Sequence, residues 1–124
     1  MIDFTNNEFI KLREIDIDSV YDEIEPLLVP GEEVISAYKA IRDYCIFTSK
    51  RVISVNVQGM SGKRKDFTSL PYSKITTFSV ETSGIIDLDS ELELYFSGVG
   101  QVHFEFTSDK NIYKIAKIIS TYVL

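Results

Sequence analysis

Apolar residues between positions 17 and 28 recur at the spacing of one helix face. The residues of this stripe are Ile17, Val20, Tyr21, Ile24, Leu27 and Leu28. A 3.6-residue period places them on one side, which predicts a helix. Asp16 or Asp18 can cap its start, and Pro26 should kink or end it before Val29-Pro30-Gly31. Residues 1–15 have no clear period and are expected to pack as an extended arm or to fray.

Seven short β-type runs separated by turn signals follow this helix. They lie at roughly 33–41, 43–48, 51–57, 64–70, 75–82, 91–97 and 101–107. They are rich in Val, Ile, Thr, Tyr and Phe, which strands prefer. Apolar and polar residues alternate most cleanly in 51–57, 91–97 and 101–107, so we expect each of these three strands to bury one face and expose the other. That pattern is typical of antiparallel sheets.

The C-terminal segment is helical again. Ser108 or Asp109 can cap it, and its apolar stripe comprises Ile112, Ile115, Ala116, Ile119, Tyr122 and Val123. Seven strands followed by one amphipathic helix suit two orthogonal antiparallel sheets whose open end the helix plugs. The order therefore predicts a mostly-β, pleckstrin-homology-like (PH-like) sandwich or barrel of seven strands, capped by a C-terminal helix and preceded by an N-terminal helix. We expect residues 1–30 to form the arm and helix, and 31–124 the PH-like domain.

Charge and cysteine content restrict the classes of function. Thirteen basic and nineteen acidic residues give a net charge of −6, which argues against nucleic-acid binding and against a general affinity for anionic lipid. Cys45 is the lone cysteine, so no internal disulfide can form. The N-terminus lacks the layout of a signal peptide, and no apolar run reaches the length of a membrane span. We therefore expect a cytoplasmic protein.

Several short strings between Gly31 and the C-terminus carry a family resemblance. They are Arg42-Asp43, Phe47-Thr48-Ser49-Lys50-Arg51, Gln58-Gly59 with Gly62-Lys63, residues 70–75, residues 78–84 and residues 87–92. The stretch from Phe78 to Leu92 is the most specific. The chain resembles the bacterial pleckstrin-homology domains. That resemblance implies a PH-like fold and self-assembly into rings or larger oligomers, and it brings no catalytic residues.

Basic residues are the candidates for anion binding. Phosphoinositide-binding PH domains place several Lys and Arg residues on the first hairpin, where this chain has Lys39 and Arg42 beside Asp43, so binding by that route is not favoured. A candidate anion patch comprises Lys50, Arg51, Lys63, Arg64 and Lys65. The alternative, which the acidic net charge favours, is that these residues protect an edge strand from aggregation.

No residue pattern indicates catalysis, a nucleotide site or a metal site. His103 is the single histidine and is predicted to be a solvated strand residue, and Cys45 a small packed one. Residues 59–64 contain a Gly-Lys pair without the remaining glycine and Ser/Thr of a phosphate loop, so they predict a hairpin turn. Residues 87–91 lack the Gly and Glu spacing of a calcium loop. We expect a chain that is not an enzyme and holds no cofactor.

Grouped apolar residues in one connection between strands are the remaining candidate. Ile85, Ile86 and Leu88 either tuck under the domain or contact another protein chain. The neighbouring runs 75–82 and 91–97 contain no proline to protect an edge. We therefore expect a self-assembling scaffold or protein-interaction module, a homo-oligomer with a ring as one form, whose protein partner the sequence does not identify. The alternative is a module with weak binding to membranes or anionic ligands.

Overall fold

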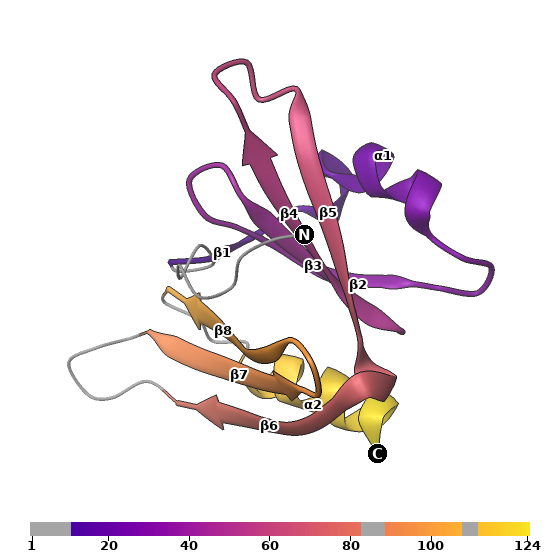
Figure 1. Ribbon diagram of the computed structural model, residues 1–124, viewed down its shortest axis with the longest axis vertical. Helices are drawn as coiled ribbons and strands as arrows, with labels where there is room; N and C mark the ends of the chain where they lie inside the picture. Colours follow the sequence, from indigo (N-terminus) through magenta and orange to yellow (C-terminus); the bar gives the residue numbers. More distant parts are fainter. Residues whose placement is uncertain (1–10, 83–88, 108–111) are drawn as a thin grey trace.

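A computed structural model describes residues 11–82, 89–107 and 112–124 as two antiparallel sheets with a C-terminal helix (Figure 1). The first sheet has the order β1-β2-β3-β4-β5, and the second the order β6-β7-β8. The strands are β1 (Arg13–Ile15), β2 (Val34–Lys39), β3 (Tyr44–Thr48), β4 (Arg51–Gln58), β5 (Arg64–Pro71), β6 (Ile75–Glu81), β7 (Ser90–Phe96) and β8 (Gly100–Phe106). The predicted mostly-β sandwich and all seven predicted strands are confirmed. The sheets do not close into a barrel.

An eighth strand comes from the segment that shows no period in the sequence. Arg13–Ile15 pairs with β2 at the edge of the first sheet. Just before it, Leu12 bridges to Phe106 of the second sheet, with Leu12 N donating to Glu105 O at 2.9 Å. Leu12 is fully buried. This part of the predicted arm therefore packs on the domain and ties the two sheets together along one side.

The prediction of one continuous N-terminal helix is wrong. The structure has a 3-10 turn at Ile17–Ser19, a four-residue helix α1 (Tyr21–Ile24) and a second 3-10 turn at Glu25–Leu27. Asp16 caps the first turn, as predicted, by accepting from Asp18 N at 3.2 Å. Pro26 lies in the first turn of the last piece, where its missing N–H costs nothing. A continuous helix would have needed that N–H.

These helical turns cover the outer face of the first sheet and create a second core. The buried residues of this core are Val20, Ile24, Ala37, Tyr44, Ile46, Ile53 and Val55. The expectation of one wet face for residues 51–57 is therefore wrong for most of β4. Val52 and Ser54 face the main core while Ile53 and Val55 pack under the helical turns, and all four are fully buried.

The main core lies between the two sheets and is completed by α2 (Ile112–Val123). The inward residues of β7 and β8 are Leu92, Leu94, Phe96, Val102, Phe104 and Phe106, all buried as the alternation predicts. Ile112, Ile115, Ile118 and Ile119 of α2 face the same core. The opposite face of β6, β7 and β8 consequently carries their polar side chains. Within the described residues, no helix is long and apolar enough to cross a bilayer.

Candidate functional site

The five cations predicted as one anion patch lie at opposite ends of a strand pair. Arg51 is the register partner of Pro71, whereas Gln58, at the far end of β4, is the partner of Arg64. At a rise of about 3.3 Å per residue, the eight-residue β4 separates Lys50 from Lys63 by more than 20 Å, roughly the length of the strand. A single small anion cannot contact both groups.

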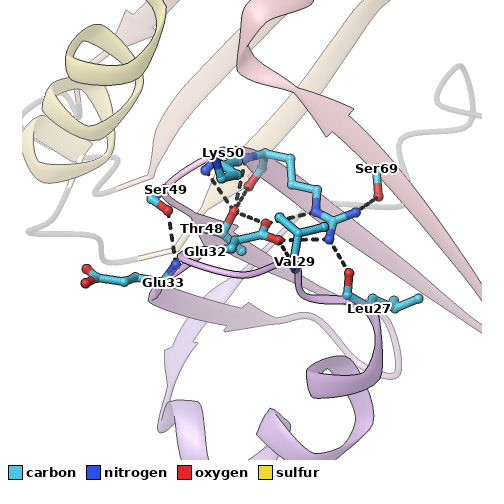
Figure 2. A network of polar contacts seen from close by, with 9 residues as sticks. Leu27, Val29, Glu32, Glu33, Thr48, Ser49, Lys50 and Ser69 are labelled. Carbon is cyan, nitrogen blue, oxygen red and sulfur yellow. Dashed lines mark hydrogen bonds and ion pairs between the residues drawn. The ribbon is translucent and has the colours of Figure 1, made fainter.

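Arg51 is held in a polar network that fastens the N-terminal segment to the β3–β4 turn (Figure 2). Its Nε and Nη2 donate to the two carboxylate oxygens of Glu32, each at 2.9 Å, and Nη2 also donates to Leu27 O at 2.6 Å. The Glu32 side chain is fully buried. Burial favours its protonated form, but hydrogen bonds from Arg51, Thr48 and Val29 outweigh that effect and lower its pKa. Arg51 is therefore a structural cation.

Lys65 is also occupied by a partner from the N-terminal segment. Its ammonium group pairs with Glu23, whose second carboxylate oxygen accepts from the hydroxyl of Tyr44. The hydrogen bonds from Lys65 and Tyr44 lower the pKa of Glu23. Lys50, Lys63 and Arg64 are exposed. Of the five predicted residues, Lys63 and Arg64 remain together at the β4–β5 turn. The positive φ of Gly59 and Gly62 there, 75° and 68°, agrees with the predicted hairpin turn.

A different group of cations lines a cavity of about 740 Å³ beside the β2–β3 hairpin. Its basic residues are Lys11, Arg13, Lys39 and Arg42. Arg13 and Lys39 are direct cross-strand partners in the β1–β2 pair, an arrangement that destabilises a sheet unless an anion offsets it. Asp43 also lines the cavity, but its carboxylate accepts from Val57 N at 2.8 Å and from Asn56 Nδ2 at 3.1 Å. The sequence singled out Lys39 and Arg42 and missed the other two, Arg13 at the start of the three-residue strand β1 and Lys11 just before it.

The outer face of the second sheet holds four carboxylates around one imidazole. Glu81 is the register partner of Glu91, and Glu91 that of Glu105, so these three carboxylates form one row across β6, β7 and β8. In the next row Glu93 is opposite His103, whose Nδ1 lies 3.5 Å from Glu93 Oε1 and whose Nε2 lies 3.8 Å from Glu91 Oε1. His103 does lie on the polar face as predicted, with 21% of its side chain exposed.

Glu91 is the middle carboxylate of that row, between Glu81 and Glu105. Partial burial raises its pKa, and so does the contact with Glu81, because a neighbouring carboxylate makes ionisation of Glu91 less favourable. His103 opposes this shift. One atom from each of Glu91, His103 and Glu105 can be chosen so that all three lie within 4.8 Å of one another.

The structure describes Cys45 but not the predicted oligomer contact. Cys45 is fully buried, and burial raises the pKa of its thiol, which confirms a packed rather than a reactive cysteine. Ile85, Ile86 and Leu88, the candidate oligomer contact, lie outside the described residues, so that contact stays a prediction.

Comparison with known proteins gives one consistent family. The family described as "Bacterial PH domain" matches residues 3–123. The uncharacterised protein YjqA of Bacillus subtilis is 44% identical over 104 residues, covering 82% of this chain and 83% of its own length. A PH-domain protein from Shewanella loihica superposes with a TM-score of 0.80 at 35% identity, covering 93% of this chain and 99% of that one. The pleckstrin homology domain from Shewanella amazonensis gives 0.67 at 36% identity, covering 98% and 99%.

Proposed function

The chain belongs to the bacterial PH domain family, and we propose that it is a non-enzymatic module whose copies assemble with one another through the edges of the second sheet. The observation that carries this proposal is the outer edge of β6, beside which the described part of the chain places no strand. Exposed strand edges present unpaired N–H and C=O groups that a second chain can pair with.

The edge of the first sheet at β5 carries charged residues and a proline, which protect strand edges in natural sheets. β5, which continues through the 3-10 turn Tyr72–Lys74 into β6, carries Arg64, Lys65 and Asp66 at its start and Pro71 at its end. β6 has one charged residue, Glu81, and no proline, and its residues Thr76, Thr77 and Ser79 are exposed. This contrast favours β6 as the edge that accepts a partner.

A second open edge lies across the same sheet. Among the described residues, Leu12 contacts the outer side of β8 at Glu105 and Thr107, which leaves the stretch 100–104 without a strand beside it. Pairing β6 of one copy with β8 of the next would extend the three-stranded sheet from copy to copy. Repetition of that head-to-tail contact closes a ring when its rotation divides a full turn. A β6–β6 contact would instead give a two-fold dimer.

Light scattering at micromolar protein tests the assembly. We expect a mass several times the 14.2 kDa of the chain. Thr77→Lys with Ser79→Lys places two charges on the β6 edge and should move the mass towards that of one chain while circular dichroism stays folded. The matched control, Ser61→Lys with Thr121→Lys, adds the same charge at two exposed positions and should keep the wild-type mass.

Each outcome of this experiment decides a different part of the proposal. A wild-type monomer would reject assembly. A folded β6 variant that keeps the wild-type mass would reject the β6 edge. The contact predicted at Ile85, Ile86 and Leu88 is tested separately by Ile86→Asp, whose unchanged mass would reject that contact alone.

A second function, anion binding, is supported by the cationic cavity rather than by the residues predicted from the sequence. Lys11, Arg13, Lys39 and Arg42 line one cavity together with Asp43. Arg13 lies directly opposite Lys39, whose charge also acts on Glu23, and a phosphate group would offset the positive charge that remains. On an acidic domain each cation contributes about 1 kcal/mol near an anionic surface. Binding through this cavity is therefore expected to be weak and sensitive to salt.

Flotation with neutral and anionic vesicles, repeated with free inorganic phosphate as competitor, tests the cavity. We expect flotation with anionic vesicles only, lost at high salt and lost in Arg13→Gln with Lys39→Gln. The control Lys74→Gln with Lys114→Gln removes two exposed cations elsewhere and should float like wild type. Equal loss in both variants would reject the cavity in favour of net charge. Flotation that free phosphate abolishes would show that the cavity recognises the phosphate group itself, and flotation that phosphate leaves unchanged would reject a phosphate site in the cavity.

A further inference from the structure

We propose that Glu91, His103 and Glu105 bind a divalent transition-metal ion, with Zn²⁺ as the representative ion, on the outer face of the second sheet. This site departs from the sequence-based expectation of no metal. Its three ligands lie on β7 and β8, and none of them lines the cationic cavity.

The donor set matches the chemistry of such ions. An imidazole nitrogen with two carboxylates is a mixed nitrogen and oxygen set that Zn²⁺ and its neighbours accept. Ligands of a tetrahedral ion at about 2.0–2.2 Å from the metal lie roughly 3.3–3.5 Å apart. Ligand atoms of the three residues lie within 4.8 Å of one another, so small rotations of the long Glu side chains reach that separation. The strands hold the three backbones in register.

The orientation of the imidazole is a second, independent feature that favours a ligand role. Nδ1 of His103 faces Glu93 at 3.5 Å, while Nε2 faces Glu91 at 3.8 Å. Metal-binding histidines usually donate the N–H of one ring nitrogen to a carboxylate, which frees the other nitrogen for the metal. Glu93 is therefore assigned as the positioning residue, and Nε2 as the ligand atom.

The charge of the surrounding face also favours a cation. Glu81, Glu91 and Glu105 are direct neighbours across three strands, and like charges opposite each other destabilise a sheet. His103 is the basic group that the described contacts place among them. A bound divalent ion would offset the repulsion among these carboxylates, and acid should weaken binding because protons compete with the metal for its ligands.

Calorimetry with tag-free protein and ZnCl₂ in a non-chelating buffer tests the site. We expect one Zn²⁺ per chain and at least a tenfold loss of affinity in His103→Gln. Glu93→Gln should weaken binding by about 10–100-fold, the usual effect of losing an outer carboxylate partner. Glu33→Gln removes an exposed carboxylate elsewhere and should bind like wild type. Saturable binding that His103→Gln leaves unchanged, equal competition by Ca²⁺, or no saturable binding would each overturn the proposal.

Nitrogen-15 NMR of the imidazole distinguishes coordination by His103 from non-specific binding of the ion to an acidic surface. The chain has one histidine, so its two ring nitrogens give the imidazole signals without overlap. Zn²⁺ should shift the Nε2 resonance and leave Nδ1 protonated. Imidazole signals that stay unchanged at saturating Zn²⁺ would show that the ion binds elsewhere, and a shift at Nδ1 instead would overturn the assignment of Glu93.

Discussion

Replacing Glu32 with Gln should cost the domain a large part of its stability, although Glu32 belongs to none of the proposed binding surfaces. Its side chain is fully buried and accepts hydrogen bonds from Arg51 Nε and Nη2, from Thr48 Oγ1 at 2.7 Å and from Val29 N at 3.1 Å. Gln keeps the shape of the side chain but removes the charge that these donors converge on. The substitution thus leaves the Arg51 guanidinium without its counter-charge.

The expected magnitude follows from the surroundings of Arg51. Removing one partner of a buried ion pair costs about 3–5 kcal/mol. Arg51 keeps bonds to Leu27 O and Ser69 Oγ, and 18% of its side chain is exposed, so we expect the lower end, about 3 kcal/mol. At roughly 4 °C per kcal/mol for a chain of this size, Tm should fall by about 12 °C.

Urea unfolding and calorimetry of wild type, Glu32→Gln and Glu33→Gln measure this effect. Glu33 is the adjacent, exposed carboxylate, and its substitution should change the unfolding free energy by less than about 0.5 kcal/mol. The double variant with Arg51→Met should recover part of the loss, because it no longer buries an unpaired charge. A Glu32→Gln protein within 0.5 kcal/mol of wild type, on that same scale, would refute the reasoning.

The same network predicts a pH dependence with a definite sign. Because the pKa of Glu32 is lowered from its ordinary value of 4.5 in the folded chain, its ionised form contributes stability above that value. This contribution is lost as the pH falls through the folded pKa. The stability difference between wild type and Glu32→Gln should therefore narrow below about pH 4.5. A difference that stays constant on acidification would show that the charge of Glu32 is not what stabilises the network.

Two further substitutions or modifications test the core. Leu12→Ala should lower the free energy of unfolding by about 2–5 kcal/mol, because this fully buried residue joins both sheets. The control Ile41→Ala, at a side chain that is 95% exposed, should be close to neutral. Equal effects of the two substitutions in urea unfolding would contradict the bridging role of Leu12. Cys45 should resist iodoacetamide in the folded protein and react once urea unfolds it, because burial raises its thiol pKa. Rapid labelling of the native chain, detected by intact-protein mass spectrometry, would contradict this.

The local patterns of the sequence determined most of the secondary structure. Leu92, Leu94 and Phe96 alternate with polar residues, and a period of two places them on one face of a strand whatever lies beyond it. The same reasoning predicted β8 and the existence of α2. Pattern failed where an element is too short to have a period, as in β1, or where proline interrupts it, as in the turns around Pro26.

Burial on the second face of β4 depends on another segment of the chain. The alternation in residues 51–57 predicts one wet face, and nothing in β4 itself indicates that Val20 and Ile24 cover Ile53 and Val55. Which segment covers this face is decided by the tertiary structure, because a side chain is buried only when another part of the chain packs against it.

Tertiary structure alone also decided which charges meet. Arg13 and Lys39 are 26 positions apart, and Glu81, Glu91 and Glu105 lie on three strands, yet each set is brought together by strand register. The sequence identified Arg51 as a surface cation, while its burial against Glu32 makes it part of the framework. Period and propensity act between neighbours along one strand, whereas register is fixed by the packing of strand pairs. The sequence therefore predicts where the strands lie, whereas the candidate binding sites follow only from which strands pair and in which register.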